Sequence, residues 1–429
     1  MSEQSTRPAH IAVVNDALHG HVRPSLAVVQ ELMARGHRVT YAVPRPLDRV
    51  VAPTGAELRI RRVSLRTSGI DLSDLDSPLM KGPHLDLVGA LLKKAGRALR
   101  ELAGLYEGDE PDLVLGDSVV PASRALAHAW GVPHIQLTAH SIAWEGYYDP
   151  DGPGGAHPLP PERVRAAYRE LSRWLRRQGA PSGRTLFSWH PGRALVMLPR
   201  MLQPHADRVD ERLYTFVGTC YENHAEQGNW KAPTEAEKVL LVSFGSLFTR
   251  QPDLYRECVR AFGDLPGWHV VLQTGGHMPA PDTAKLPRNV EVRPWVPQLA
   301  VLRQADLFVT HAGAGGAQEG LATGTPMICV PLALDQPVNA AMLESLGVAR
   351  VLPPHEVTAA ALRTALEELT GDPAVAERCR TVRARMCRDG GAQRAADIVE
   401  AALRDGSSAV RPEPVWSAAG RPTSPGGGR

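Results

Sequence analysis

The sequence predicts two doubly wound α/β domains of similar size, and three observations indicate them. Short apolar runs alternate with helical patterns along most of the 429 residues, which is typical of βαβ units and parallel sheets. A second series of such runs begins after residue 217. A polar stretch poor in apolar residues, 218–234, separates the two series and is interpreted as an interdomain linker.

The first series begins with an apolar run, Ile11–Val14, that predicts a buried strand. A helix is expected over Pro24–Arg35, because Leu26, Val29 and Leu32 fall on one face and Gly36 can end it. Further strands of this domain are predicted at Val39–Val43, Leu113–Leu115, His134–Leu137 and Ala194–Met197.

The second series predicts a helix that starts near Pro252 and a second set of strands. Those strands are expected at Val239–Phe244, His269–Leu272, Val290–Val292, Leu307–Thr310 and Met327–Val330. The expected division is a domain over 1–217, the linker over 218–234, and a domain over 235–405 whose last helix can cross back to the first domain. Residues 406–429, rich in Pro, Gly, Ser and Arg, are predicted to be a disordered tail.

Two segments, 66–90 and 144–185, fit the alternation poorly. Long insertions on a rigid scaffold often shape a substrate pocket, but surface elaboration is an equally good reading for any one residue in them.

Composition excludes several classes of function. The net charge is only +2, with 43% hydrophobic and 22% charged residues, so bulk nucleic-acid binding is not expected. The five cysteines show no metal-ligand or redox spacing and are read as thiols in a reducing compartment. Residues 1–8 carry no apolar signal core and no run approaches the roughly 20 apolar residues of a membrane helix, so we expect a cytoplasmic protein without stable membrane insertion.

The most informative window runs from Trp295 to Glu319. A strand is followed by a turn of small residues, His311–Gly316, and then by a helix. Backbone N–H groups at a helix N-terminus favour a phosphate, and small residues let it approach closely. Within this window His311 can donate to a diphosphate, Glu319 can accept ribose hydroxyls, and Trp295 offers a flat face to a base. A glycine turn, a Trp and a Glu are each weak signals alone, but together they favour a nucleotide-sugar site.

A candidate general base lies just after the first strand, at His19 or His21. A neutral imidazole can take a proton from a hydroxyl, and a carboxylate that fixes its tautomer assists it. Asp117 is a candidate partner, because it ends another strand of the same domain and so can lie at the same edge. Spacing alone does not choose between the two histidines, nor between catalysis and helix capping.

These residues resemble glycosyltransferase family 1 enzymes of the GT-B fold, in which two Rossmann-like domains face each other across a cleft. The resemblance is strongest to bacterial macrolide glycosyltransferases of actinomycetes. It spans about His10 to Arg404 and is carried by His19–Leu26, Leu202–Asp210 and the Trp295–Glu319 window with the downstream pair Asp335 and Gln336.

The resemblance implies inverting transfer of a hexose from a uridine diphosphate sugar. It assigns the base to His19, with Asp117 as its orienting partner. Trp295 would stack on uracil, the Val296 backbone would read the base edge, and Gln298 and Glu319 would contact the ribose. The diphosphate would be held by Ser246, His311 and the glycines Gly313, Gly315 and Gly316. Asp335 and Gln336 would bind hydroxyls of the sugar, which fits glucose better than a deoxysugar.

Two departures from the family pattern stand out. Gly315 occupies a position where plant relatives carry Asn, and the first loop contains Asp16, more polar than the family leads us to expect. Asp16 either alters which acceptors fit or is simply a loop residue.

The expected substrates are UDP-glucose and a small-molecule acceptor, first of all a macrolide that is inactivated by glucosylation. No cofactor and no metal are expected, because no carboxylate pair is placed to hold Mg²⁺ at the diphosphate. Another polyketide or a phenol stays open as acceptor, as do a lipid-linked acceptor, a nucleotide-sugar epimerase or hydrolase, and a non-catalytic nucleotide-sugar binding protein. The sequence does not predict the oligomeric state.

Overall fold

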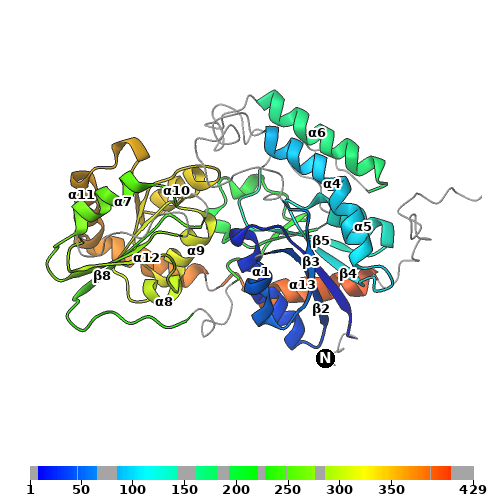
Figure 1. The fold of residues 1–429 in the computed structure, drawn as a ribbon, viewed down its shortest axis with the longest axis horizontal. Coiled ribbons are helices and arrows are strands. Elements are labelled where there is room, and N and C mark those ends of the chain that lie inside the picture. The colour runs from blue at the N-terminus through cyan, green and yellow to red at the C-terminus, as the bar shows by residue number, and fades with distance from the viewer. Residues whose placement is uncertain are drawn as a thin grey trace, which may run out of the picture.

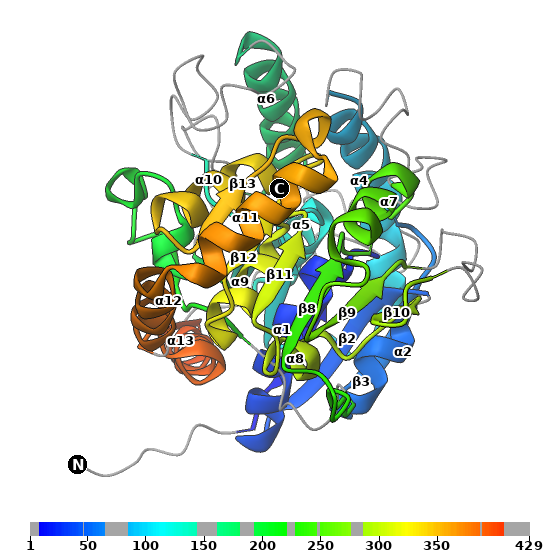
Figure 2. The same ribbon diagram turned by 90° about the vertical axis from the view of Figure 1, so that its left-hand side faces the viewer.

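Two parallel sheets, each covered by helices on both faces, form the two halves of the molecule (Figures 1 and 2). The computed structural model describes residues 8–45, 47–64, 85–143, 161–180, 193–220, 228–246, 249–275, 286–386 and 388–406. Most of the insertion at 66–90 and of the tail at 406–429 therefore lies outside these residues, as do 144–160 and 181–185 of the second insertion and 221–227 of the linker.

The N-terminal sheet has the strand order β3-β2-β1-β4-β5-β6-β7, and every pairing in it is parallel. This order reverses direction beside β1, so loops after β1 and β4 meet at one edge of the sheet, where ligands of such folds collect. The strands are β1 His10–Val14, β2 Arg38–Pro44, β3 Glu57–Arg61, β4 Leu113–Asp117, β5 His134–Thr138, β6 Ala194–Val196 and β7 Tyr214–Phe216. The helices are α1 His19–Ala34, α2 Asp48–Val51, α4 Leu85–Leu105, α5 Pro121–Trp130 and α6 Pro161–Arg177, with short 3₁₀ turns at Ala52–Thr54, Arg200–Leu202 and Ala206–Arg208.

The C-terminal sheet repeats this plan with the parallel order β10-β9-β8-β11-β12-β13. Its strands are β8 Lys238–Ser243, β9 Trp268–Gln273, β10 Val290–Arg293, β11 Leu307–Thr310, β12 Met327–Cys329 and β13 Ala349–Val351. The helices are α7 Pro252–Phe262, α8 Gln298–Leu302, α9 Ala314–Thr323, α10 Gln336–Ser345, α11 Ala359–Gly371, α12 Pro373–Met386 and α13 Gly391–Gly406, with a 3₁₀ turn at Pro354–Glu356.

All strands expected from apolar runs are present, which confirms the fold class. Three strands were not predicted, namely β3, β7 and β13. The last two have only three residues each, and β3 carries charged residues at alternate positions because it is an edge strand. The first helix starts at His19 and not at Pro24, so Pro24 lies in its second turn, where a proline removes one intrahelical hydrogen bond.

The last helix, α13, packs against the N-terminal domain. Its Ala395, Ala396 and Val399 are buried in the same apolar cluster as α1 and β1, and Figure 1 shows it running beneath that domain. The guanidinium of Arg35, just after α1, donates to Asp397 at 2.6 Å and to Glu400 at 3.2 Å. Beside this helix the chain crosses between the domains twice, and the Gly391 N–H donates to the Val217 carbonyl oxygen at 2.8 Å.

Four cysteines of the described chain, Cys220, Cys258, Cys329 and Cys379, are buried free thiols. Burial raises the pKa of Cys258 to about 12, so this thiol stays protonated and packs as a small apolar side chain. No helix among the described residues is long and apolar enough to cross a membrane.

Candidate functional site

His21 and Asp117 form an ion-paired hydrogen bond at the edge of the N-terminal sheet. Nδ1 of His21 lies 2.9 Å from Oδ2 and 3.1 Å from Oδ1 of Asp117. Asp117 is buried at the end of β4, where Oδ1 also accepts the Val119 N–H at 2.7 Å. Burial on its own would lower the pKa of His21, but the charge and hydrogen bond of Asp117 outweigh it and raise that pKa. A carboxylate on Nδ1 leaves Nε2 as the nitrogen that can take a proton.

The expected pairing of Asp117 with His19 is therefore wrong, because Asp117 is hydrogen-bonded to His21 in the structure. Both histidines lie in the first turn of α1, and side chains two apart on a helix point to nearly opposite sides. Only one of them can face Asp117. The ring of His19 instead meets the ring of Trp295 edge-on, with centroids 5.9 Å apart and planes at 85°.

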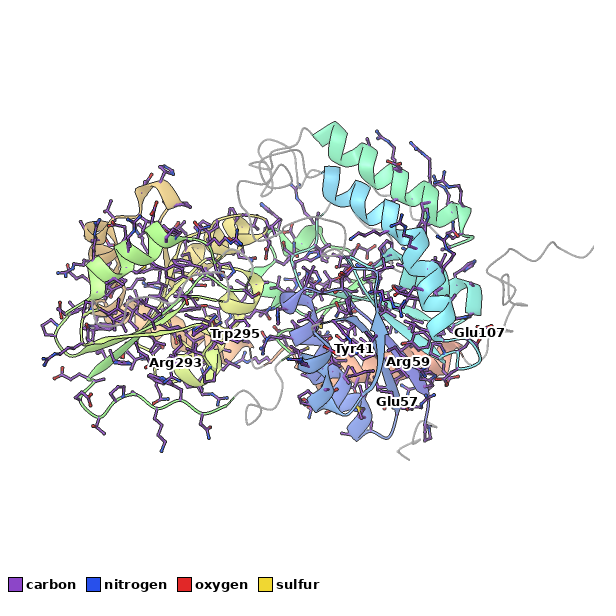
Figure 3. The ribbon with its side chains drawn as sticks, viewed as in Figure 1. Tyr41, Glu57, Arg59, Glu107, Arg293 and Trp295 are labelled. Atoms are coloured by element: carbon purple, nitrogen blue, oxygen red, sulfur yellow. The ribbon has the colours of Figure 1, made fainter. Side chains whose placement is uncertain are left out.

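Trp295 projects from the C-terminal domain toward the N-terminal one, and Figure 3 labels it beside that boundary. Trp295 is 52% exposed, which is unusual for a tryptophan and leaves ring surface open to a ligand. The next residue, Val296, donates its backbone N–H to Oε1 of Gln273 at 3.1 Å. The Val296 carbonyl oxygen is therefore the backbone group of this residue that can contact a base edge.

The turn between β11 and α9 is shaped around the half-buried ring of His311. A Cβ added at Gly245 would lie 2.6 Å from this ring and one at Gly313 would be equally close, so both positions need glycine. A Cβ at Gly315 would meet nothing within 4 Å, because the start of α9 is open there. No side chain caps α9 at Gly313, so its first N–H groups and positive dipole end are available to an anion.

His311 is neutral at neutral pH. Burial lowers its pKa to about 4, and the nearby charge of Asp335 and the Ser243 backbone offset this only in part. His311 can therefore contribute a hydrogen bond to a diphosphate but not a positive charge. Gly316 follows in the first turn of α9, and Ser246 is half-buried in the loop after β8, the strand that pairs with β11.

Gln298 and Glu319 come together from two helices. Nε2 of Gln298, the first residue of α8, donates to Oε2 of Glu319 in the second turn of α9. This hydrogen bond orients the carboxylate, whose oxygens can accept from hydroxyl donors, as ribose recognition requires.

Asp335 and Gln336 lie at the start of α10 and are held in different ways. Oε1 of Gln336 accepts the backbone N–H groups of Leu332 at 2.7 Å and Ala333 at 3.0 Å, so its amide group is left to donate. Oδ2 of Asp335 accepts Nδ2 of Asn339 at 2.7 Å, and the same nitrogen donates to the Ala312 carbonyl oxygen at 3.0 Å. Asn339 thus ties Asp335 to the turn that precedes α9.

The two walls of the site face each other across the domain boundary. The charge of Asp335, from the C-terminal domain, raises the pKa of His21 in the N-terminal domain and also acts on His311. The carboxylate of Asp335 therefore lies within electrostatic reach of the His21–Asp117 pair.

Asp16 is a buried residue of the N-terminal domain. Its Oδ1 accepts the Ala17 N–H at 2.6 Å, and its charge acts on the buried Arg61. With Arg61, Ser64 and Lys94 it lines a small pocket whose other walls are apolar residues from the segment after β3, from α4, and from the start of α5 and the loop before it. Asp16 is therefore a buried carboxylate with partners in a pocket, and not a solvated loop residue.

Sequence reasoning missed Gln273, Asn339, Ser118 and His140. Gln273 and Asn339 are polar residues at the end of a strand and inside a helix that carry no motif on their own. His140, two residues after β5, could have been found, because it follows a neighbouring strand of the same sheet as Asp117. In the part of the chain that the structure describes, no group of three or more His, Cys, Asp or Glu could hold a metal ion.

Residues 220–385 match the family model described as UDP-glucoronosyl and UDP-glucosyl transferase. An oleandomycin glycosyltransferase of Streptomyces antibioticus is 52% identical over 404 residues, covering 94% of this chain and 93% of the relative. The chain belongs to glycosyltransferase family 1.

Other members of this family agree with the assignment. A demethyllactenocin mycarosyltransferase of Streptomyces fradiae is 32% identical over 409 residues, with 94% of this chain and 88% of the relative covered. The solved structure of the glycotransferase of kitacinnamycin matches with a TM-score of 0.80 and 43% identity, covering 92% of this chain and 100% of that one. CalG4, the calicheamicin glycosyltransferase, matches with a TM-score of 0.76 and 33% identity, covering 93% and 99%.

As a family 1 glycosyltransferase with the GT-B fold, the protein is an enzyme that uses a nucleotide-sugar donor and a small-molecule acceptor. The match of the family model to 220–385 covers the α9 turn, Gln298, Glu319, Asp335 and Gln336, which all lie in the C-terminal domain. The resemblance inferred from the sequence is thus confirmed.

Proposed function

We propose that the protein transfers glucose from UDP-glucose, with inversion, to a hydroxyl of a small-molecule natural product, first of all a macrolide. The His21–Asp117 pair, facing Asp335 and the open N-terminus of α9, is the observation that supports it most directly. The similarity to enzymes named for oleandomycin and demethyllactenocin supports a macrolide acceptor. Glucosylation of such an antibiotic in the cytoplasm would inactivate it and protect the producing cell.

In this mechanism His21 replaces His19 as the general base. The acceptor oxygen attacks the anomeric carbon from the face opposite the diphosphate. The bond from the anomeric carbon to the phosphate oxygen breaks, and the diphosphate leaves with the electron pair. The acceptor proton passes to Nε2 of His21, and Asp117 stabilises the imidazolium that forms.

On the donor side, we propose that Trp295 stacks on uracil and that the Val296 carbonyl oxygen meets the base edge. Gln298 and Glu319 would bind the ribose. The diphosphate would rest on the first N–H groups of α9, beside Gly313, Gly315, Gly316 and His311 and within reach of Ser246. Asp335 and the amide of Gln336 would bind sugar hydroxyls, which favours glucose over a sugar that lacks them.

The test is a mass-shift assay with purified protein, UDP-glucose and a panel of macrolides and phenols. We expect a macrolide to gain one hexose with an inverted, β-configured linkage. Transfer only to phenols would overturn the macrolide assignment. Release of free glucose or of an altered nucleotide sugar, without any acceptor product, would indicate a hydrolase or an epimerase instead. Tight binding of UDP-glucose without any reaction would indicate a binding protein.

Metal independence belongs to the same proposal. The helix N-terminus and His311 stabilise the leaving diphosphate without a cation. The same assay should therefore give an unchanged rate in excess EDTA, and a rate that vanishes with EDTA and returns with Mg²⁺ would contradict it.

Glu319→Ala should weaken UDP-glucose binding by roughly tenfold or more, because a hydrogen bond to a charged group is worth about 1.5–3 kcal/mol. The 2′-deoxyribose analogue of UDP-glucose should lose much less affinity in the same variant, since it lacks one hydroxyl that the carboxylate would accept. Calorimetric titration of both nucleotides measures this, with Glu319→Gln as the isosteric control. Equal losses for both nucleotides would remove Glu319 from the 2′-hydroxyl.

A further inference from the structure

A second histidine, His140, lies beside the His21–Asp117 pair and has no part in the mechanism above. It follows β5, which pairs with β4, so it reaches the same edge of the sheet as Asp117. The centroid of its ring is 5.8 Å from that of His21, with the planes inclined at 52°.

The hydrogen bonds of His140 define its tautomer. Nδ1 lies 2.9 Å from the carbonyl oxygen of Ser141. A carbonyl oxygen can only accept, so Nδ1 carries the proton. Burial and the neighbouring charge of His21 lower the pKa of His140, which keeps the ring neutral. Nε2 of the neutral ring is therefore an acceptor.

The hydroxyl of Ser118 has one proton and two possible acceptors at equal distance. Its Oγ lies 3.3 Å from Nε2 of His140 and 3.3 Å from Oδ1 of Asp117. Oδ1 already receives the Val119 N–H at 2.7 Å and lies 3.1 Å from Nδ1 of His21. Among the described residues, Ser118 is the hydrogen-bond donor that the structure gives to Nε2 of His140. Oδ1 thus has two other donors, whereas a half-buried imidazole nitrogen left without its donor is costly, so this competition favours the imidazole.

We propose that His140 is a positioning residue that holds the Ser118 hydroxyl away from Asp117 and so keeps the negative charge of Asp117 available to His21. This inference rests on the proposed role of His21 as the base. It assigns to His140 and Ser118 a role in setting the basicity of His21.

The sign of the effect follows from the single hydroxyl proton. Without an acceptor at position 140, Ser118 donates to Oδ1 of Asp117 and shares part of its charge. Asp117 then stabilises the His21 imidazolium less, and the pKa of His21 falls. A base of lower pKa takes the acceptor proton less readily, so kcat falls and the acid limb of the pH profile moves to lower pH.

The charged and titratable groups that face His140 come from three places. They are His21 on α1, Asp117 at the end of β4, and Asp335 before α10. The charge of Asp16, after β1, also acts on His21. All of these groups stay in place in the variants below, so a change in the titration of His21 reports on the Ser118 hydroxyl.

The test is the titration of His21 by NMR of the histidine ring Cε1–H groups in the full-length protein, without substrates. The His21 signal is assigned by its loss in His21→Gln. His140→Leu should lower the pKa of His21 by roughly half a unit to one unit, the range expected when a hydrogen bond to a charged group is redistributed. His140→Gln, whose amide can still accept from Ser118, should restore most of the wild-type value.

Ser118→Ala gives a second and independent reading. If His140 already holds the hydroxyl, removal of the hydroxyl leaves the His21 pKa near the wild-type value. His140→Leu added to Ser118→Ala then causes no further shift of that pKa. A His21 pKa that rises in Ser118→Ala, or one that falls equally with and without the hydroxyl, would overturn the proposal. This arm remains informative if His140→Leu does not fold, which a thermal melt shows.

The kinetic arm uses pH profiles of kcat at saturating UDP-glucose and acceptor. His140→Leu should shift the acid limb in the same direction as the NMR titration, lower kcat several-fold, and leave KM for UDP-glucose unchanged. An unmoved acid limb together with an unmoved His21 signal contradicts the inference. An NMR shift in a protein that transfers no sugar would instead contradict the proposed function alone.

Discussion

His21→Ala is expected to lower kcat for sugar transfer by roughly 10²–10⁴-fold, the usual contribution of a general base. Dissociation of UDP-glucose should change little, because the donor residues lie in the other domain. His19→Ala is the matched control on the same turn of α1. Since its ring lies against Trp295, we expect a higher KM for UDP-glucose with most of kcat retained. Steady-state kinetics and calorimetry separate these effects, and the opposite pattern would return the base to His19.

The pH profile of the wild-type enzyme also tests the assignment of His21 as the general base. Asp117 raises the pKa of His21 above its ordinary value of 6.5, against the effect of burial. The base is protonated and inactive below that raised pKa, so kcat/KM should fall as the pH drops through it. The contribution of the ion pair to folding stability depends on pH in the opposite direction. It is present at low pH and is lost as the pH rises through the raised pKa of His21.

Gly245→Ala is expected to destabilise the C-terminal domain by about 2–4 kcal/mol and to abolish donor binding. The backbone there has a φ of +78°, which disfavours any side chain, and a Cβ would lie 2.6 Å from the ring of His311. Gly313 also packs closely against this ring, near the same ring atoms, so the turn on both sides of His311 is tightly packed. The substitution thus displaces the turn that precedes α9.

Gly315→Ala is the matched control in that turn. A Cβ there meets nothing in the protein, and alanine favours a helix over glycine by roughly 0.5–1 kcal/mol. We expect equal or higher thermal stability but roughly tenfold or weaker UDP-glucose affinity, because the methyl group would occupy space that the diphosphate needs. Thermal melts with and without UDP-glucose measure both. Undiminished donor binding in Gly315→Ala would move the diphosphate away from the start of α9.

Periodicity was enough for the architecture and the donor side. Apolar runs such as Ile11–Val14 and Leu307–Thr310 are buried in parallel sheets, where both faces are covered, so they stand out from the helical patterns between them. The residues from Trp295 to Glu319 are close in the chain, and one strand–turn–helix unit brings most of them together. Local sequence therefore carries that part of the site.

The tertiary structure decided the residues that pair across long separations. Asp117 is 96 residues from His21, and the choice between His19 and His21 depends on the rotation of α1 over the sheet. A two-residue shift on a helix turns a side chain to nearly the opposite side, so no spacing rule in the chain reveals it. The placement of Asp335 within electrostatic reach of His21, and of Ser118 between Asp117 and His140, likewise depends on which loops meet at one sheet edge and on how two domains face each other. The sequence by itself determined which chemistry is present, and the fold decided which groups act on one another.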